Sequence, residues 1–325
     1  MRVASRALTE KEREKLTVYL HKGAAGDWDF DLLANEFELD DLLDWGFDKK
    51  ELDIDLWAGD PPEDVEPQID KAEELREKWG VESGQLWKLG EHRLICGDCT
   101  DKAVVEKVMQ GEQADCVMTD PPYGMGLDAN FADIHSSRST VALGGGKQRS
   151  HNNYDKVLGD NGDFDFTNIA YIWEFAPEVF LWGADYYIDS VPEFGKSGSW
   201  IVWDKKPLGD MAEAIGNQFE MCLSKQRHKR IIIDYTYSGA YGMKPDDGHR
   251  VHPTQKPVDL IKGMLDRWGK SNDIVVDFFL GSGTTLIACE RLGRKCRAVE
   301  ISPAYVAVAI QRWVDVTNGT PELLE

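Results

Sequence analysis

Hydrophobic and polar positions change character about a quarter of the way along this 325-residue chain. Before residue 80, apolar residues recur at helical spacing in an acidic background, as in residues 30–46 and 49–57. After residue 81, short apolar runs alternate with longer helical patterns. This alternation predicts an α/β domain preceded by a small helical segment.

Seven of the apolar runs are predicted to form strands, and an eighth is predicted as a hairpin extension at residues 230–235. The seven span residues 92–97, 115–119, 179–183, 199–204, 219–225, 274–279 and 295–301. Helices are predicted at residues 101–110, 166–178, 258–269, 284–293 and 303–315. The last helix has a favourable start, because Ser302 suits the N-cap position and Pro303 suits the first helical position.

Composition divides the chain into three parts. Residues 1–57 are predicted to form an acidic helical segment. Residues 58–80 are predicted to form a linker and a helix, since residues 58–68 hold three prolines. Residues 81–325 are predicted to form the main domain. Within it, residues 125–165 are polar and irregular, and an insert of that length is usually functional.

The formal net charge of −21 at pH 7 is unfavourable for a protein that binds a polyanion, but over half of the negative excess lies in the first quarter of the chain. Residues 1–80 hold 23 acids and 11 bases, and the remaining 245 residues hold 35 acids and 26 bases. A local basic face on the main domain therefore stays compatible with nucleic-acid binding.

The sequence gives no indication of a membrane or metal protein. No apolar run reaches the ~18 residues of a membrane helix, and no signal peptide opens the chain, so we expect a cytoplasmic protein. Cys96 and Cys99 lack a second pair at zinc spacing, so no metal site is expected.

A strand, a glycine turn and a helix follow one another in residues 275–293, VVDFFLGSGTTLIACERLG. Gly281 and Gly283 would let a ligand approach the backbone, and the helix N-terminus adds free N–H groups. Glu300 ends the next strand, where an acid commonly binds ribose hydroxyls. Leu286 replaces the third glycine of a dinucleotide loop, and the turn lacks the lysine of a P-loop. The pattern favours a ligand with a ribose and no pyrophosphate, such as S-adenosylmethionine.

The tetrapeptide DPPY, Asp120 to Tyr123, follows the predicted strand at residues 115–119. Two prolines restrict the backbone there, so the Asp120 carboxylate and the Pro121 carbonyl are held as two hydrogen-bond acceptors. An exocyclic amino group has two N–H bonds that such a pair can accept, and Tyr123 offers a flat face for a base. The arrangement suits methylation of an amino group on a base flipped out of a duplex.

Together these motifs resemble those of the β class of amino-group DNA methyltransferases, over roughly residues 84–315. DPPY resembles the catalytic motif, residues 277–285 resemble the cofactor motif, and HPTQKP at 252–257 resembles the segment before the cofactor strand. The GD at 97–98 is similar to the strand end that contacts the cofactor's adenine. The resemblance implies a Rossmann-like, seven-stranded mixed sheet with residues 219–225 as its reversed strand. It also implies a methyltransferase that depends on S-adenosylmethionine.

The motifs and the resemblance together give the candidate site. The residues assigned to catalysis are Asp120, Pro121, Pro122 and Tyr123. The residues assigned to the cofactor are Asp98, Cys99, Lys256, Asp277, Phe279, Gly281, Ser282, Gly283, Thr284, Thr285 and Glu300. Aspartate at the first catalytic position resembles enzymes that modify adenine at N6, whereas serine is common in cytosine-N4 enzymes. Adenine is therefore the expected target, and cytosine-N4 is the alternative.

The substrate that the resemblance implies is double-stranded DNA. The class carries its recognition segment between the reversed strand and HPTQKP, here within residues 224–251, and residues 125–165 are a second candidate region. The basic residues expected to contact DNA are Lys225, Arg227, Lys229, Arg230, Arg138, Lys147 and Arg149. Residues 1–57 are similar to the tail of a ParB-like domain, for which a helical remnant or a homodimer contact is expected.

Overall fold

The structure, a computed structural model, describes residues 65–122, 166–186, 188, 198–205, 217–235 and 256–324. It also describes Thr9, Arg13, Lys15, Leu16, Asp41 and Trp45. The chain divides into two compact units, Met1–Asp60 and Pro61–Glu325. This boundary falls inside the predicted linker. The larger unit begins before residue 81, the predicted start, because helix α4 (Ala72–Trp79) packs against helix α9 (Pro303–Thr317).

The described residues form a sheet of ten strands rather than the seven that the resemblance implies. The strands are β1 (Leu86–Leu89), β2 (His92–Cys96), β3 (Cys116–Thr119), β4 (Glu178–Trp182), β5 (Ser199–Asp204), β6 (Phe219–Ser224), β7 (Ile231–Asp234), β8 (Ile274–Asp277), β9 (Lys295–Glu300) and β10 (Glu322–Leu323). Their order across the sheet is β10-β1-β2-β9-β8-β3-β4-β6-β5-β7. All seven predicted strands and the eighth are present, and β1 and β10 are additions at one edge.

The sheet is mixed, as predicted. Strands β2, β9, β8, β3 and β4 pair in parallel, and β6 runs antiparallel to both β4 and β5, so it is the predicted reversed strand. The prediction of a hairpin at β7 is wrong. β7 pairs in parallel with β5, because β6 already has β4 and β5 as its two neighbours.

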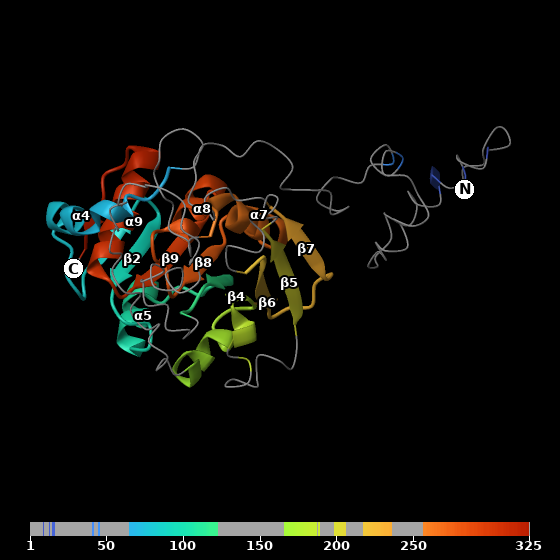
Figure 1. Cartoon of the computed structure of the whole chain (residues 1–325), viewed down its shortest axis with the longest axis horizontal. Helices are drawn as coiled ribbons and strands as arrows, with labels where there is room; N and C mark the ends of the chain where they lie inside the picture. Colours follow the sequence, from blue (N-terminus) through green and yellow to red (C-terminus); the bar gives the residue numbers. More distant parts are fainter. Residues whose placement is uncertain are drawn as a thin grey trace, which may run out of the picture. The chain divides into compact units, whose positions relative to one another are not determined.

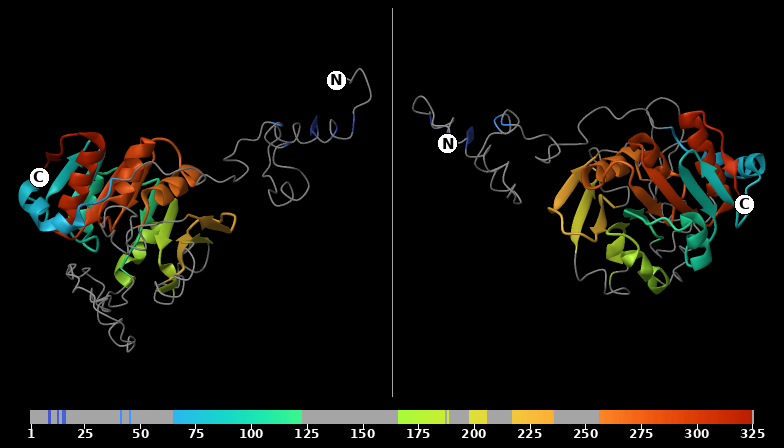
Figure 2. Two further views of the ribbon diagram at one scale, coloured as in Figure 1. Left: turned by 45° about the horizontal axis from the view of Figure 1, so that its top comes forward. Right: turned by 180° about the vertical axis from the view of Figure 1, so that it is seen from behind.

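Helices cover the two faces of the sheet unequally. Helices α7 (Val258–Trp268), α8 (Thr284–Leu292), α9 and α4 lie along one face, as Figure 1 shows. Helix α5 (Lys102–Met109) and the 3₁₀ helix η2 (Phe166–Glu174) cover the other face, so the helix predicted at residues 166–178 is shorter and more tightly wound than expected. Figure 2 shows α4 and α9 at the same end of the sheet as the C-terminus.

The central strands are apolar on both faces because helices cover both. Val117, Val179 and Val276 have no exposed surface, and they pack with α5 and η2 in one continuous core. The predicted helix start at Ser302 is confirmed, since its side chain accepts a hydrogen bond from the Tyr305 N–H. In the described part of the chain, no helix combines the length and apolar character needed to cross a membrane.

Candidate active site

The strands that carry the two main motifs lie side by side at the centre of the sheet. β3 pairs with β8 in parallel, with Cys116 opposite Val275 and Val117 opposite Val276. Asp120 and Phe278 therefore leave the sheet at the same edge. We call this edge the carboxyl edge. It consists of the amino end of β6 and the carboxyl ends of β2, β3, β4, β5, β8 and β9. Open α/β sheets bind their ligands at such an edge.

A buried carboxylate joins the two strand ends. Asp277 Oδ1 accepts hydrogen bonds from Thr119 Oγ1 at 2.9 Å and from the Phe279 N–H at 3.0 Å. The Phe278 N–H donates to Thr119 Oγ1 at 3.2 Å. Burial raises the pKa of Asp277 to about 6, although hydrogen bonds from Thr285, Phe279 and Thr119 oppose that rise.

The second buried carboxylate at this edge belongs to Glu300. Its Oε2 accepts a hydrogen bond from the Gly281 N–H at 2.8 Å, and its Oε1 accepts one from the Ser302 N–H at 2.8 Å. Burial raises the pKa of Glu300 to about 6 despite these two bonds. Each carboxylate oxygen has a second lone pair, so the group can still accept ligand hydroxyls.

Glycine occupies the two loop positions, 281 and 283, for different structural reasons. Gly281 (φ 56°) and Gly283 (φ 93°) both adopt the left-handed conformation that favours glycine. A Cβ at Gly281 would meet nothing within 4 Å, whereas a Cβ at Gly283 would lie 3.1 Å from the Ala309 Cβ. Gly283 therefore allows α8 to approach α9 closely, a role that differs from the predicted ligand approach.

Contacts inside the protein fix the rest of the loop. Thr284 Oγ1 donates to the Lys256 carbonyl at 3.2 Å. The buried guanidinium of Arg312 donates to the Ser282 carbonyl at 3.3 Å and to the Val65 carbonyl at 2.8 Å. The turn thus has a preformed backbone, with the first N–H groups of α8 at the carboxyl edge.

Asp98 and Cys99, which were predicted to contact the cofactor, lie beside Glu300. The Gly97 N–H donates to the Glu300 carbonyl at 2.9 Å, which joins the end of β2 to that of β9. The Tyr171 hydroxyl donates to the Cys99 carbonyl at 2.6 Å. Burial raises the pKa of the Cys99 thiol to about 12, so it stays protonated and unreactive at neutral pH.

Asp120 is bound by a buried lysine. Lys256 Nζ donates a hydrogen bond to Asp120 Oδ2 and lies 3.0 Å from Glu220 Oε2. Lys205 forms an ion pair with the other oxygen of Glu220. Lys256, which was predicted to bind the cofactor, thus has its side chain directed at Asp120.

The structure brings most of the predicted catalytic and cofactor residues to the carboxyl edge. Pro121 is buried there, Pro122 is half-buried, and Phe279 packs against the core beneath η2. Tyr123 lies outside the described residues, so its predicted stacking role stays a prediction. The same is true of Arg138, Lys147 and Arg149.

The sequence of this domain matches a known family of proteins. The family model N6_N4_Mtase, described as DNA methylase, matches residues 114–311, which is more than half of the chain. The chain belongs to this DNA methylase family. It is therefore an enzyme that acts on DNA, and its methyl donor is S-adenosylmethionine, on which the family depends.

Two curated relatives and one solved structure illustrate the similarity. The methylase is 24% identical over 245 residues to Type II methyltransferase M.HinfI of Haemophilus influenzae, covering 67% of each chain. It is 24% identical over 257 residues to M.HpaI of Haemophilus parainfluenzae, covering 70% of this chain and 76% of the relative. The M1.HpyAVI–SAM complex is 20% identical with a TM-score of 0.41, covering 67% of this chain and 98% of that one.

The carboxyl edge of the methylase fits this cofactor. S-adenosylmethionine offers ribose hydroxyls as donors and a sulfonium as a cation. Asp277 and Glu300 supply two carboxylates at the ends of adjacent strands, and both have raised pKa values from burial. Carboxylates accept hydrogen bonds from hydroxyl donors and are stabilised by a nearby cation, and S-adenosylmethionine brings both kinds of group.

The basic segment predicted to bind DNA lies at the other end of the sheet. Residues 224–230 connect β6 to β7 at the amino end of β4, opposite the carboxyl edge. Lys225 Nζ donates to Glu174 and to the Ala176 carbonyl, both at 3.2 Å. Arg227, Lys229 and Arg230 are exposed. The structure therefore places these four basic residues at the end of the sheet opposite Asp120, and their predicted contact with DNA stays a prediction.

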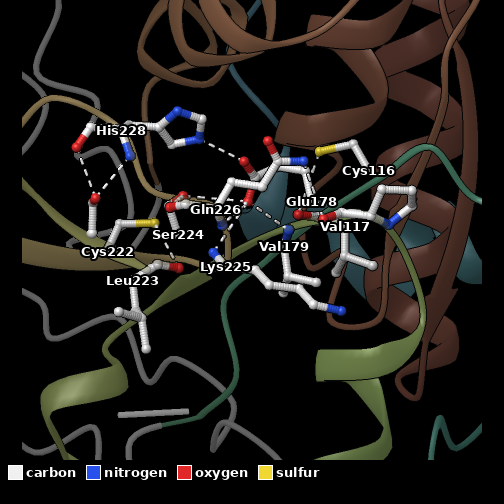
Figure 3. Close-up of polar contacts among 12 residues, drawn as sticks. Cys116, Val117, Glu178, Val179, Cys222, Leu223, Ser224, Lys225, Gln226 and His228 are labelled. Atoms are coloured by element: carbon white, nitrogen blue, oxygen red, sulfur yellow. Dashed lines mark hydrogen bonds and ion pairs between the residues drawn. The ribbon is translucent and has the colours of Figure 1, made fainter. Parts of the chain in front are cut away.

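The basic segment is organised around Glu178, the first residue of β4 (Figure 3). Glu178 Oε1 accepts hydrogen bonds from the N–H groups of Lys225 and Gln226 at 3.1 and 3.2 Å and from Ser224 Oγ at 3.3 Å. His228 Nε2 lies 2.5 Å from Glu178 Oε2. A buried acid thus fixes the loop that holds the basic residues.

Five further residues shape the site and were not predicted from the sequence. They are Thr119, Tyr171, Lys205, Glu220 and Arg312. Two of them had a recognisable signal in the sequence. Glu220 is an acid inside the mostly apolar strand FEMCLS, and Arg312 is a cation among the buried positions of α9. A charge placed among buried positions is usually paired or functional.

Proposed function

We propose that this methylase transfers the methyl group of S-adenosylmethionine to the exocyclic N6 of an adenine flipped out of double-stranded DNA. The observation that carries the proposal is the position of Asp120. It follows β3 directly, beside the β8 strand end whose loop is the predicted cofactor site. An acceptor for an amino group and a methyl-donor site are thus neighbours on adjacent strands.

The chemistry needs an amine whose lone pair is available. The N6 lone pair of adenine is delocalised into the ring, so the amine is a poor nucleophile. The Asp120 carboxylate and the Pro121 carbonyl together can accept both N–H bonds and favour a tetrahedral nitrogen. Catalysis of this kind depends on positioning and on charge stabilisation, which a rigid proline-fixed backbone supports.

Adenine is proposed because the first position of the tetrapeptide is an aspartate. The exocyclic N4 of cytosine offers the same two N–H donors, so the test must identify the methylated base. The protein is incubated with duplex DNA of mixed sequence and labelled S-adenosylmethionine, and the DNA is digested to nucleosides. We expect label in N6-methyl-2′-deoxyadenosine, whereas label in N4-methyl-2′-deoxycytidine would replace the proposal with the cytosine alternative.

A catalytic variant provides the control. Asp120→Ala removes the proposed acceptor and leaves the β8 loop intact. We expect methyl transfer to fall below detection while the dissociation constant for S-adenosylmethionine, measured by calorimetry, stays within about twofold of the parent. Substantial turnover by this variant would contradict the role of Asp120.

A further inference from the structure

Four charged side chains of alternating sign form a continuous chain at the carboxyl edge. They are Asp120, Lys256, Glu220 and Lys205, here called the charge chain. Each comes from a different segment: the end of β3, the residues before α7, the start of β6 and the end of β5. Their association therefore depends on the complete sheet.

The charge chain lies against an apolar floor. Lys256 Nζ is 4.9 Å from the Trp182 ring centroid, and Lys205 Nζ is 5.2 Å from that of Trp203. Both tryptophans are almost fully buried. Electrostatic interactions are stronger in such surroundings than in water, so each charge in the chain depends strongly on its neighbours.

Lys256 is a permanent cation in this position. Its side chain is 6% exposed, and burial alone would lower its pKa. The carboxylates of Asp120 and Glu220 outweigh that effect and raise the pKa above the ordinary lysine value. Lys256 therefore cannot act as a base at neutral pH, and its contribution must come from charge and geometry.

We propose that Lys256 and Glu220 are positioning residues for Asp120, with Lys256 fixing the carboxylate and Glu220 sharing the lysine's charge. The inference rests on the proposed function, because it assigns a role relative to the amino-group acceptor. Lys256 binds Oδ2 of Asp120, and a carboxylate has lone pairs for further donors. The target amine can then be received by a carboxylate whose orientation is already set.

Glu220 is the less obvious member. With Lys256 bound to Asp120 alone, the full ammonium charge would neutralise the acceptor and compete with the target amine for it. Glu220 lies 3.0 Å from the same ammonium and takes part of that interaction. Lys205 in turn balances Glu220. The four charges sum to zero, which is the condition for burying them together.

The rival assignment is that Lys256 binds the cofactor, as its motif suggests. The two assignments differ in what a substitution changes. A cofactor residue affects the dissociation constant for S-adenosylmethionine, whereas a positioning residue for Asp120 affects kcat on DNA. They also differ in the effect of substituting Lys256 and Glu220 together. If the two residues act independently, the losses of kcat from the two single substitutions multiply.

The test is a double-mutant cycle on the full chain, using Lys256→Met, Glu220→Gln and the two together. Methylation of duplex DNA gives kcat and KM, calorimetry gives the cofactor dissociation constant, and urea unfolding checks that each variant folds. Lys256→Arg keeps the charge and serves as the conservative variant. Lys102→Met on the surface of α5, where the side chain is 89% exposed, is the matched control.

We expect Lys256→Met to lower kcat by roughly 100-fold, the scale of a misplaced catalytic group, with an unchanged cofactor dissociation constant. Glu220→Gln should lower kcat on the order of tenfold, the lower limit for losing one hydrogen bond to a charged group. The double variant should lose no more than about 100-fold, because it removes one charge of each sign. Independent effects would instead give about 1,000-fold. Lys256→Arg should recover part of the activity.

Three outcomes separate the possibilities. An unchanged kcat in Lys256→Met, beside a parent that methylates DNA, overturns the inference and leaves the proposed function standing. A weakened cofactor dissociation constant with an unchanged kcat assigns Lys256 to the cofactor and also overturns it. A parent that methylates no DNA overturns the proposed function and the inference with it.

Discussion

Replacing Asp277 with asparagine should make the cofactor-free protein more stable. The carboxylate is buried at the end of β8, and burial raises its pKa from an ordinary value of 3.8 to about 6. The folded state therefore holds the proton more tightly than the unfolded state does. Ionisation destabilises the fold as the pH rises from about 4 to about 6, and the full cost is present above pH 6.

The magnitude follows from that pKa difference. One pKa unit corresponds to ~1.4 kcal/mol, so the ionised carboxylate costs about 2–3 kcal/mol at pH 7.5. Asparagine removes this cost and keeps the hydrogen bonds. Its one carbonyl oxygen can accept from both Thr119 Oγ1 and the Phe279 N–H, as Asp277 Oδ1 does now. The Thr285 hydroxyl can accept from an amide as well as donate to a carboxylate.

Urea unfolding at pH 7.5 and pH 5.0 tests this reasoning. We expect Asp277→Asn to raise the free energy of unfolding by about 2–3 kcal/mol at pH 7.5, and by about half as much at pH 5.0. Asp70→Asn is the matched control, since Asp70 is exposed and should change the stability at neither pH. A variant that is less stable than the parent, or equally stabilised at both pH values, would refute the argument.

Three further predictions concern the loop and the two ends of the sheet. Glu300→Ala should weaken S-adenosylmethionine binding by ~1.5–3 kcal/mol in calorimetry, and unchanged affinity would mean that the carboxylate does not contact the ligand. Arg312→Met should lower the free energy of unfolding by ~1–3 kcal/mol, because it leaves the buried Ser282 carbonyl without this donor, and urea unfolding measures the loss. Changing Arg227 and Lys229 to alanine should leave the salt dependence of DNA affinity unchanged; a slope flatter by about two units would show that both contact phosphates.

The fold was predictable from the sequence where buried elements appear as a pattern of apolar residues. The central strands are apolar on both faces, so residues 115–119 and 274–279 stood out as short apolar runs before a proline pair and a glycine turn. β10 has only two residues, both exposed, and it exists because β1 provides a neighbour. β7 forms at the predicted residues but does not form the predicted hairpin, because the neighbours of one strand in a sheet depend on the positions of the other strands.

The site was predictable where a motif is continuous and not where contacts are long-range. In the glycine loop and the tetrapeptide, the glycine and proline residues themselves determine the local backbone conformation. The direction of the Lys256 side chain depends on Glu220, which lies on another strand. In the basic segment, four cations within six positions were visible, but Glu178, which holds the loop, precedes it by 46 residues. Local charge therefore predicted a binding face that the sheet topology does not place beside Asp120.

The carboxylates of the cofactor site lead to a final prediction on pH. In the protein alone, Asp277 and Glu300 have pKa values of about 6, raised by burial. A ligand that brings a sulfonium cation and hydroxyl donors favours their ionised forms, so its binding should release protons.

The affinity for S-adenosylmethionine should therefore fall as the pH drops below about 6. A single carboxylate of this kind weakens binding by roughly tenfold between pH 7 and pH 5 if only its ionised form binds. Calorimetry across this range measures the effect. The Asp277→Asn variant should show a shallower dependence, because one of the two titrating groups is gone. An affinity that is constant from pH 7 to pH 5 would mean that neither carboxylate faces the ligand, and the cofactor would then be held by the backbone of the glycine loop alone.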